Sequence, residues 1–123
     1  MNLKILKEEF TVCKVENYDD VDLEREFVFT AYTDEEKSLV CPTGVLPQNT
    51  IQREDGWRGF RIEGVLDFSL KGILYKISKI LYEEEIGIFV ISTYNTDYIF
   101  VKEEDLYQVT RSLEKEHYKI IKE

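Results

Sequence analysis

The sequence contains few of the residues that carry metal, redox or nucleophilic chemistry. It has two cysteines and one histidine in 123 residues. Cys13 and Cys41 lie 28 positions apart, outside the Cys-x-x-Cys and zinc-ligand spacings. We therefore expect both cysteines to be reduced, small hydrophobic side chains in strands, with no metal and no cofactor bound.

Positive charge and long apolar runs are also scarce. Sixteen Lys and Arg residues face 25 Asp and Glu residues, so the net charge is −9, and such a field repels phosphate backbones and anionic lipid. No stretch approaches the ~20 apolar residues of a membrane span. The N-terminal residues 1–9 are broken by charges too early for a signal peptide. We expect a cytoplasmic protein that binds neither nucleic acid nor membrane.

Recognisable catalytic motifs are missing as well. There is no glycine-rich phosphate loop, nucleophile elbow or metal motif. His117 lies near the end of a predicted helix, where it favours the helix dipole. The acidic runs 34–36, 83–85 and 103–105 lie at predicted turns and helix ends, where solvated capping is the simpler interpretation, and nothing singles out a catalytic acid–base pair. We predict no catalytic residue and a protein that is not an enzyme.

What the chain does have is enough apolar sequence for a core. Hydrophobic residues make up 43% and aromatic residues 13%, which at this length fits one compact domain or two small modules. Residues 57–64 alternate as a half-buried strand. A helix is predicted from Phe68 or Ser69 to about Glu84, and its apolar residues recur at spacings of three and four: Leu70, Ile73, Leu74, Ile77, Ile80 and Leu81. Gly72 in its first turn costs up to ~1 kcal/mol relative to Ala, which suggests a close approach to the backbone there.

The rest of this half continues the alternation of strands and helices. A β-branched run, 86–94, and a second strand, 98–102, form a hairpin around residues 95–97. A helix is predicted for 104–116 and a last strand for 118–121. Strand, helix, strand, strand, helix, strand on one antiparallel sheet predicts an α+β, ferredoxin-like βαββαβ fold for residues 57–123.

Residues 1–50 are less regular. Residues 3–15 alternate as a long strand, and 27–32 with 37–41 form a hairpin around residues 33–36. Residues 42–56 are polar, contain Pro47 and lack periodicity, so they are predicted to connect the two halves.

Three segments together resemble a known family: residues 63–74, residues 88–98 and the hairpin of residues 33–42. They are similar to the CASTOR-type ACT family, small bacterial tandem-ACT proteins that resemble the eukaryotic cytosolic arginine sensor. The resemblance implies a truncated N-terminal ACT-like module, residues 1–50, packed against an ACT domain, residues 57–123. It also implies an amino-acid site made by the first turn of the first helix and by the hairpin turn. On this chain those residues are Phe68, Ser69, Leu70, Gly72, Ile73, Thr93, Tyr94, Asn95, Thr96 and Asp97.

The chemistry of these residues suits an amino acid, although each has a simpler explanation. Asp97 offers an acceptor for the ammonium group, and the amides at the helix start offer donors for the carboxylate. Asp97 could equally be a turn residue that bonds its own backbone, Gly72 a packing glycine and Ser69 a plain cap. Phe68 and Tyr94 could be core or interface aromatics. We expect a regulatory protein that binds an amino acid or a similar small molecule. The alternative is an interaction module without a ligand, and a homodimer is compatible with both.

Overall fold

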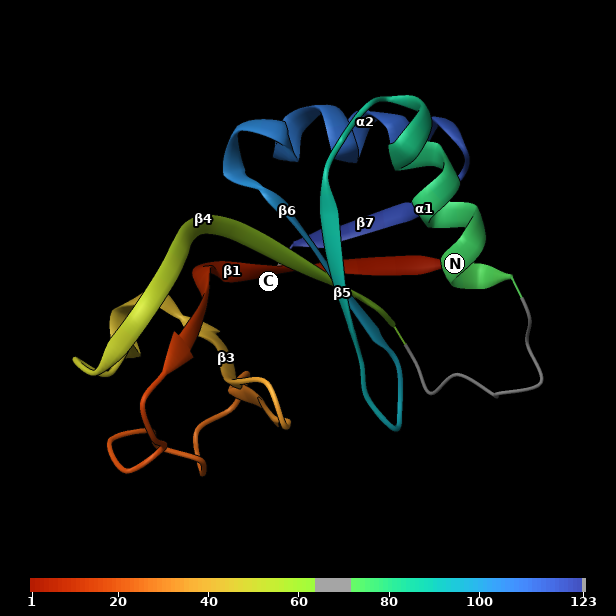
Figure 1. Ribbon diagram of the computed structural model, residues 1–123. Helices are drawn as coiled ribbons and strands as arrows, with labels where there is room; N and C mark the ends of the chain where they lie inside the picture. Colours follow the sequence, from red (N-terminus) through yellow and green to blue (C-terminus); the bar gives the residue numbers. More distant parts are fainter. Residues whose placement is uncertain (64–71, 123) are drawn as a thin grey trace. The chain divides into compact units, whose positions relative to one another are not determined.

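The chain divides into two compact units. The computed structural model describes residues 1–63 and 72–122. We call the first unit, Met1–Lys7 with Arg58–Glu123, the helical unit, and the second, Glu8–Trp57, the hairpin unit. Two long strands, β1 (Asn2–Val15) and β4 (Thr50–Ile62), each contribute residues to both units (Figure 1). The first seven residues therefore belong with the C-terminal part of the chain.

The helical unit is a mixed α/β domain built on one sheet. Its other strands are β5 (Ile88–Ser92), β6 (Asp97–Lys102) and β7 (Lys119–Lys122), and the order is β7-β1-β4-β6-β5. The predicted hairpin is confirmed, since β5 and β6 pair antiparallel. The prediction of a four-stranded, wholly antiparallel sheet from residues 57–123 is wrong. Residues of β1 lie between β4 and β7, and Asn2–Ile5 pair with β7 in parallel.

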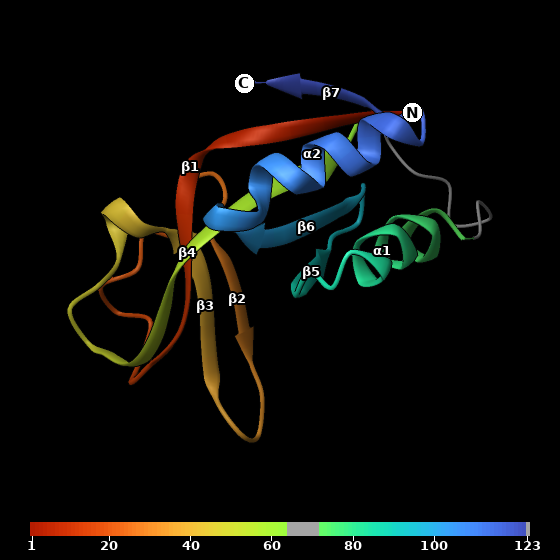
Figure 2. The same ribbon diagram turned by 90° about the horizontal axis from the view of Figure 1, so that it is seen from above.

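Both predicted helices exist and cover the same face of this sheet (Figures 1 and 2). They are α1 (Ile73–Glu83) and α2 (Leu106–Lys115), the latter preceded by a 3₁₀ turn, η2 (Glu103–Asp105). Their buried residues pack on a single core formed with the strands: Leu3, Ile5, Phe60, Ile62, Ile77, Leu81, Ile86, Ile99, Val101, Val109 and Leu113. Each fully buried Leu or Ile contributes about 1.5–3 kcal/mol to this packing.

The start of α1 differs from the prediction. The helix begins at Ile73, and Gly72 precedes it with φ +83°, in the left-handed region. The inference that Gly72 interrupts the first helical turn is therefore wrong. Glycine occurs there because a residue with a Cβ adopts a left-handed backbone only at a cost.

The hairpin unit consists mostly of strands. The predicted pairing of its two short strands, β2 (Phe29–Tyr32) and β3 (Lys37–Pro42), is confirmed, and a 3₁₀ turn follows, η1 (Thr43–Val45). β3 also pairs antiparallel with residues 10–14 of β1. A small core forms from Cys13, Val15, Leu39 and Cys41, and both cysteines are free and buried.

The predicted connector between the halves is largely a strand. β4 begins at Thr50, well inside the segment 42–56 that was expected to lack regular structure. Residues 51–55 are exposed on both faces, so they carry no alternation of apolar and polar side chains. A strand held by backbone pairing alone leaves no hydrophobic period in the sequence.

The two hairpins share a construction. β3 and β6 begin at residues 37 and 97, and η1 and η2 begin at residues 43 and 103, so both pairs are 60 positions apart. Each hairpin turn starts with a threonine whose amide bonds to a carbonyl three residues later: Thr33 to Glu36, 2.9 Å, and Thr93 to Thr96, 2.8 Å.

Candidate functional site

The turn between β5 and β6 is held by its two threonines. The amide and hydroxyl of Thr93 both donate to the carbonyl of Thr96, at 2.8 and 3.0 Å. Thr96 is 5% exposed, and its hydroxyl donates to the carbonyl of Ile62 at 2.7 Å. This bond joins the turn to the last residue of β4. Thr96 therefore holds the turn against the end of β4.

Asp97 lies at the end of the hairpin, on the side of the sheet that carries the helices. It is opposite Ser92, whose hydroxyl donates to the Asp97 carboxylate. Side chains alternate along a strand, so Asp97 shares a face with Ile99 and Val101, which are part of the core under α1 and α2. Asp97 is the first residue of β6 rather than part of the turn, and its partner is a neighbouring strand rather than its own backbone.

The start of α1 is the second part of the predicted site. Phe68, Ser69 and Leu70 lie outside the described residues. Gly72 is exposed, and a Cβ built on it would meet nothing within 4 Å. No described side chain caps the helix, so first-turn amides have no side-chain acceptor among the described residues. Ile73 is half-buried and packs against the core.

The tip of the hairpin is open. Tyr94 is 83% exposed, and Thr93 and Asn95 are also exposed. Tyr94 is therefore not the core aromatic that its residue type suggested.

A polar cluster that sequence reasoning missed lies on the opposite face of the same strands. The Arg61 guanidinium approaches the Glu63 carboxylate, with a closest ion-pair distance of 3.5 Å, and donates to the Tyr98 hydroxyl at 3.4 Å. These bonds raise the pKa of Arg61, and the Tyr98 hydroxyl is the largest cause. The sequence feature that could have revealed this cluster is the alternation of Arg61 and Glu63 with the apolar Phe60 and Ile62, which puts the two charged residues on one face of the strand. Because alternation reverses the face, Arg61 does not converge on Asp97.

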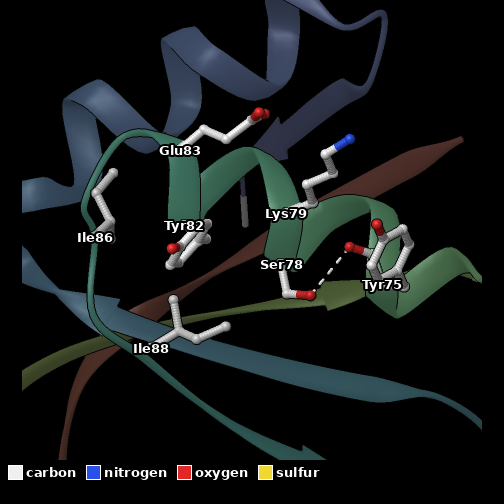
Figure 3. Close-up of a pocket in the computed structure, with 7 residues that line it drawn as sticks. All are labelled: Tyr75, Ser78, Lys79, Tyr82, Glu83, Ile86 and Ile88. Atoms are coloured by element: carbon white, nitrogen blue, oxygen red, sulfur yellow. Dashed lines mark hydrogen bonds between the residues drawn. The ribbon is translucent and has the colours of Figure 1, made fainter.

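A separate hollow of about 530 Å³ lies between α1 and the start of β5 (Figure 3). It is lined by Tyr75, Ser78, Lys79, Tyr82, Glu83, Ile86 and Ile88. None of the predicted ligand-binding residues lines it. The structure thus separates the apolar hollow from the polar hairpin end.

Other sites find little support in the described part of the chain. Residues 1–63 and 72–122 contain no group of three or more His, Cys, Asp or Glu side chains that could hold a metal ion. Burial raises the pKa of the Cys13 thiol and raises that of Cys41 to about 11, so both remain neutral thiols near pH 7. Neither described helix is long and apolar enough to cross a membrane.

Comparison with known proteins is consistent with this geometry. A crystal structure of a protein from Agobacterium tumefaciens has 28% identity and a TM-score of 0.86, and the match covers 99% of this chain and 92% of that one. A Vibrio cholerae protein of unknown function, described as a possible transport protein, has 21% identity and a TM-score of 0.75, covering 90% and 85%. The ligand-free regulatory subunit of aspartate kinase from Thermus thermophilus has 6% identity and a TM-score of 0.64, covering 92% and 95%. The last two likenesses concern the fold alone.

No curated protein matches the sequence. A family model described as ACT domain matches residues 52–115, which is just over half of the chain and includes both helices and the β5–β6 hairpin. The chain belongs to the ACT domain family.

Proposed function

We propose that this protein is a regulatory amino-acid-binding protein of the CASTOR type, with its site at the end of the β5–β6 hairpin and the start of α1. The observation that carries the proposal is the position of Asp97. It lies at the hairpin end, on the helix-bearing side of the sheet, three positions after the exposed Tyr94. The likeness to a regulatory subunit of aspartate kinase supports a regulatory role rather than a catalytic one.

The two ends of an amino acid have complementary groups here. The Asp97 carboxylate accepts from the ammonium group, while Ser92 keeps the carboxylate in place. The first amides of α1 donate to the carboxylate of the ligand, favoured by the positive end of the helix dipole. α1 and β5 run in opposite directions (Figure 1), so the start of α1 lies toward the end of β5 that carries Ser92. Gly72 leaves space for the ligand backbone.

The hairpin unit is proposed to be a truncated ACT module, as the resemblance implied for residues 1–50. Its β2–β3–η1 order repeats as β5–β6–η2, and the starts of β3 and β6, like those of η1 and η2, are 60 residues apart. Its strands also occur in the order β2-β3-β1-β4, which is the 2-3-1-4 order of a ferredoxin-like sheet. Neither helix of the module has a described counterpart between residues 8 and 57. A cytoplasmic, non-catalytic role belongs to the same proposal.

The test is calorimetric titration of the wild-type protein and two site variants with the amino acid that raises its melting temperature. Asp97→Ala removes a charge-assisted bond and should weaken binding by about 1.5–3 kcal/mol, or roughly ten- to a hundredfold. Gly72→Asn adds a side chain at the open position and tolerates the positive φ better than valine does. It should weaken binding while the protein stays folded. Gly72→Val, by contrast, should destabilise the protein because its β-branched side chain is strained at φ +83°.

The matched control is Asp105→Ala, which removes a carboxylate at the start of α2, away from the hairpin end. It should bind like the wild type. If Asp97→Ala and Gly72→Asn also bind like the wild type, the proposed site is wrong.

The second candidate function is an interaction module without a ligand. It is favoured by the hollow along α1 and by the exposed Tyr75 and Tyr82 in its lining. None of the predicted ligand-binding residues lines this hollow, so the amino-acid site does not account for it.

A further inference from the structure

The net charge of the chain lies entirely in the hairpin unit. That unit, Glu8–Trp57, contains 13 Asp and Glu residues but four Lys and Arg residues, whereas the helical unit contains 12 of each sign. The net charge of −9 is therefore the charge of the hairpin unit alone. A field of this sign attracts a basic partner and repels an acidic one, a second copy of the same unit included.

The same unit ends in an edge strand. β2 and β3 form a hairpin (Figure 2), and β2 stands at one end of the strand order, where no further described strand pairs with it. The sequence of β2, Phe-Thr-Ala-Tyr, contains no charged residue and no Pro, the residues that usually protect an edge from pairing with another chain. Thr30, Ala31 and Tyr32 are exposed. An edge of this kind accepts a strand from a partner.

The register of the hairpin identifies the backbone groups that face this edge. The Thr33 amide donates to the Glu36 carbonyl at 2.9 Å, which makes these two residues a hydrogen-bonded pair. Bonded and non-bonded pairs alternate along an antiparallel ladder, so the pairs that contain Tyr32 and Thr30 are non-bonded. In such pairs the N–H and C=O groups point away from the neighbouring strand. Those of Thr30 and Tyr32 therefore point outward from β2.

A hollow of about 690 Å³ with a net negative lining lies at the end of this edge. Four carboxylates, three of them from the turn 34–36, and two ammonium groups line it together with Tyr32. The Tyr32 ring is 70% exposed, and the Lys37 ammonium lies 4.6 Å from its centroid. This contact is a cation–π interaction, so the surroundings of the ring already stabilise one positive charge. A basic side chain from a partner strand meets carboxylates and an aromatic ring here.

We propose that β2 pairs with an extended, basic segment of another protein, which adds a strand to the hairpin unit. The backbone groups of Thr30 and Tyr32 supply the pairing, and the acidic residues on both sides of β2 attract the Lys and Arg side chains of the segment. These acidic residues are Asp22, Glu24, Glu26, Asp34, Glu35 and Glu36. A second copy of this chain does not fit the edge, because its own hairpin unit carries the same net charge. The proposal does not depend on any ligand at the end of the β5–β6 hairpin.

The probe for the test is a short fluorescein-labelled peptide in which Lys alternates with Val. Fluorescence anisotropy measures its dissociation constant with the full chain. The same peptide with Glu in place of Lys keeps the strand propensity and reverses the charge. The Lys peptide N-methylated at every backbone amide keeps the charge and cannot pair as a strand. Each control peptide should bind at least about tenfold more weakly, since one loses the charge attraction and the other the hydrogen bonds.

Variants of the protein test the edge and the charge separately. Thr30→Pro removes the outward N–H and leaves the bonds between β2 and β3 in place, since proline is tolerated in an edge strand where its nitrogen faces solvent. It should weaken binding of the Lys peptide about tenfold, and thermal unfolding verifies that it is folded. Asp34→Asn with Glu35→Gln should also weaken binding. The matched control is Glu104→Gln with Glu114→Gln, which makes the same change of charge on the helical unit and should bind like the wild type.

Binding that requires the Lys side chains, the free peptide amides and the Thr30 amide supports the proposal. No binding of the Lys peptide to the wild type at about 1 mM overturns it. Equal binding of the N-methylated peptide, or undiminished binding to Thr30→Pro, also overturns it, because attraction between opposite charges would then suffice. Equal weakening in the two double variants would show that the hairpin unit is not the binding surface. If Thr30→Pro does not fold, the N-methylated peptide still decides whether a strand pairs.

Discussion

At Gly59, the absence of a Cβ atom allows an aromatic ring to pack on the face of the sheet that lies opposite the helices. Phe89 and Phe100 are paired across β5 and β6, and their rings stack at 4.6 Å with 8° between the planes. A Cβ on Gly59 would lie 2.8 Å from the Phe100 ring, closer than any real contact. Glycine in the middle of a strand is thus explained by the aromatic ring beside it.

Gly59→Ala should destabilise the protein by about 1–3 kcal/mol, because the Phe100 ring must leave its stacked position. Urea unfolding gives the free energy directly. Gly87→Ala is the matched control, since a Cβ there meets nothing within 4 Å, and it should change stability by less than about 0.5 kcal/mol. An equal loss in both variants would contradict the explanation.

Cys41 should make stability depend on pH above neutrality. Burial, with a smaller contribution from Cys13, raises the pKa of this thiol from 9.0 to about 11. The folded protein therefore keeps a proton that the unfolded chain loses above pH 9, and stability falls as pH rises from 9 to 11. Below pH 9 both states hold the proton and the contribution is fully present.

A tenfold difference in proton affinity between the folded and the unfolded chain corresponds to about 1.4 kcal/mol of stability. The measurement is urea unfolding of the wild type and Cys41→Ala at pH 8, 9, 10 and 11. The two proteins share all other titrating groups, so the wild type should lose stability more steeply than the variant. Parallel curves would mean that the thiol is not protected by the fold.

Both helices end in the same way, and neither end uses glycine. The amide of Ile86 bonds to the Leu81 carbonyl and that of Tyr118 to the Leu113 carbonyl, the long bond of a Schellman motif. The left-handed residues in these motifs are Glu85, φ 61°, and His117, φ 72°. Glu85 also adds negative charge at the negative end of the helix dipole.

Glu85→Gly should therefore stabilise the protein by about 1 kcal/mol, since it relieves the left-handed backbone and removes the carboxylate. Thermal unfolding at pH 7 measures the gain. Glu83→Gly, in the last helical turn, should instead lose up to about 1 kcal/mol. A loss of stability in Glu85→Gly like that of the helical variant would show that the left-handed backbone is not strained.

Elements with a buried face could be predicted from the sequence, and elements without one could not. The stripe that includes Ile77 and Leu81 revealed α1, and alternating apolar residues revealed the long strand β1. The first half of β4 was missed because its side chains are exposed on both faces. The sequence did not predict that α1 begins at Ile73, because it does not show whether Gly72 adopts a left-handed or a helical backbone.

The arrangement of strands was harder to predict than their existence. Asn2–Ile5 pair with Lys119–Lys122, more than a hundred positions away, and no local pattern specifies such a partner. Of the candidate site, the sequence pattern placed Asn95 in the hairpin turn, as observed, whereas Tyr94 was expected to end the strand 86–94 and lies beyond the end of β5. It did not predict that the Thr96 hydroxyl bonds to the carbonyl of Ile62, because a buried threonine and an exposed one have the same residue type.

For the molecule as a whole, the proposed function depends on whether this ACT domain protein binds an amino acid. Binding to the folded state alone raises stability by RT ln(1 + [L]/Kd), about 2.7 kcal/mol at one hundred times Kd. The most direct measurement is the melting temperature of the wild-type protein with each of the twenty amino acids in turn. We predict that one amino acid, or a small group with related side chains, raises the melting temperature by several degrees, and that Asp97→Ala abolishes most of that rise. Twenty unchanged melting temperatures, at concentrations up to about 10 mM, would contradict the proposed function.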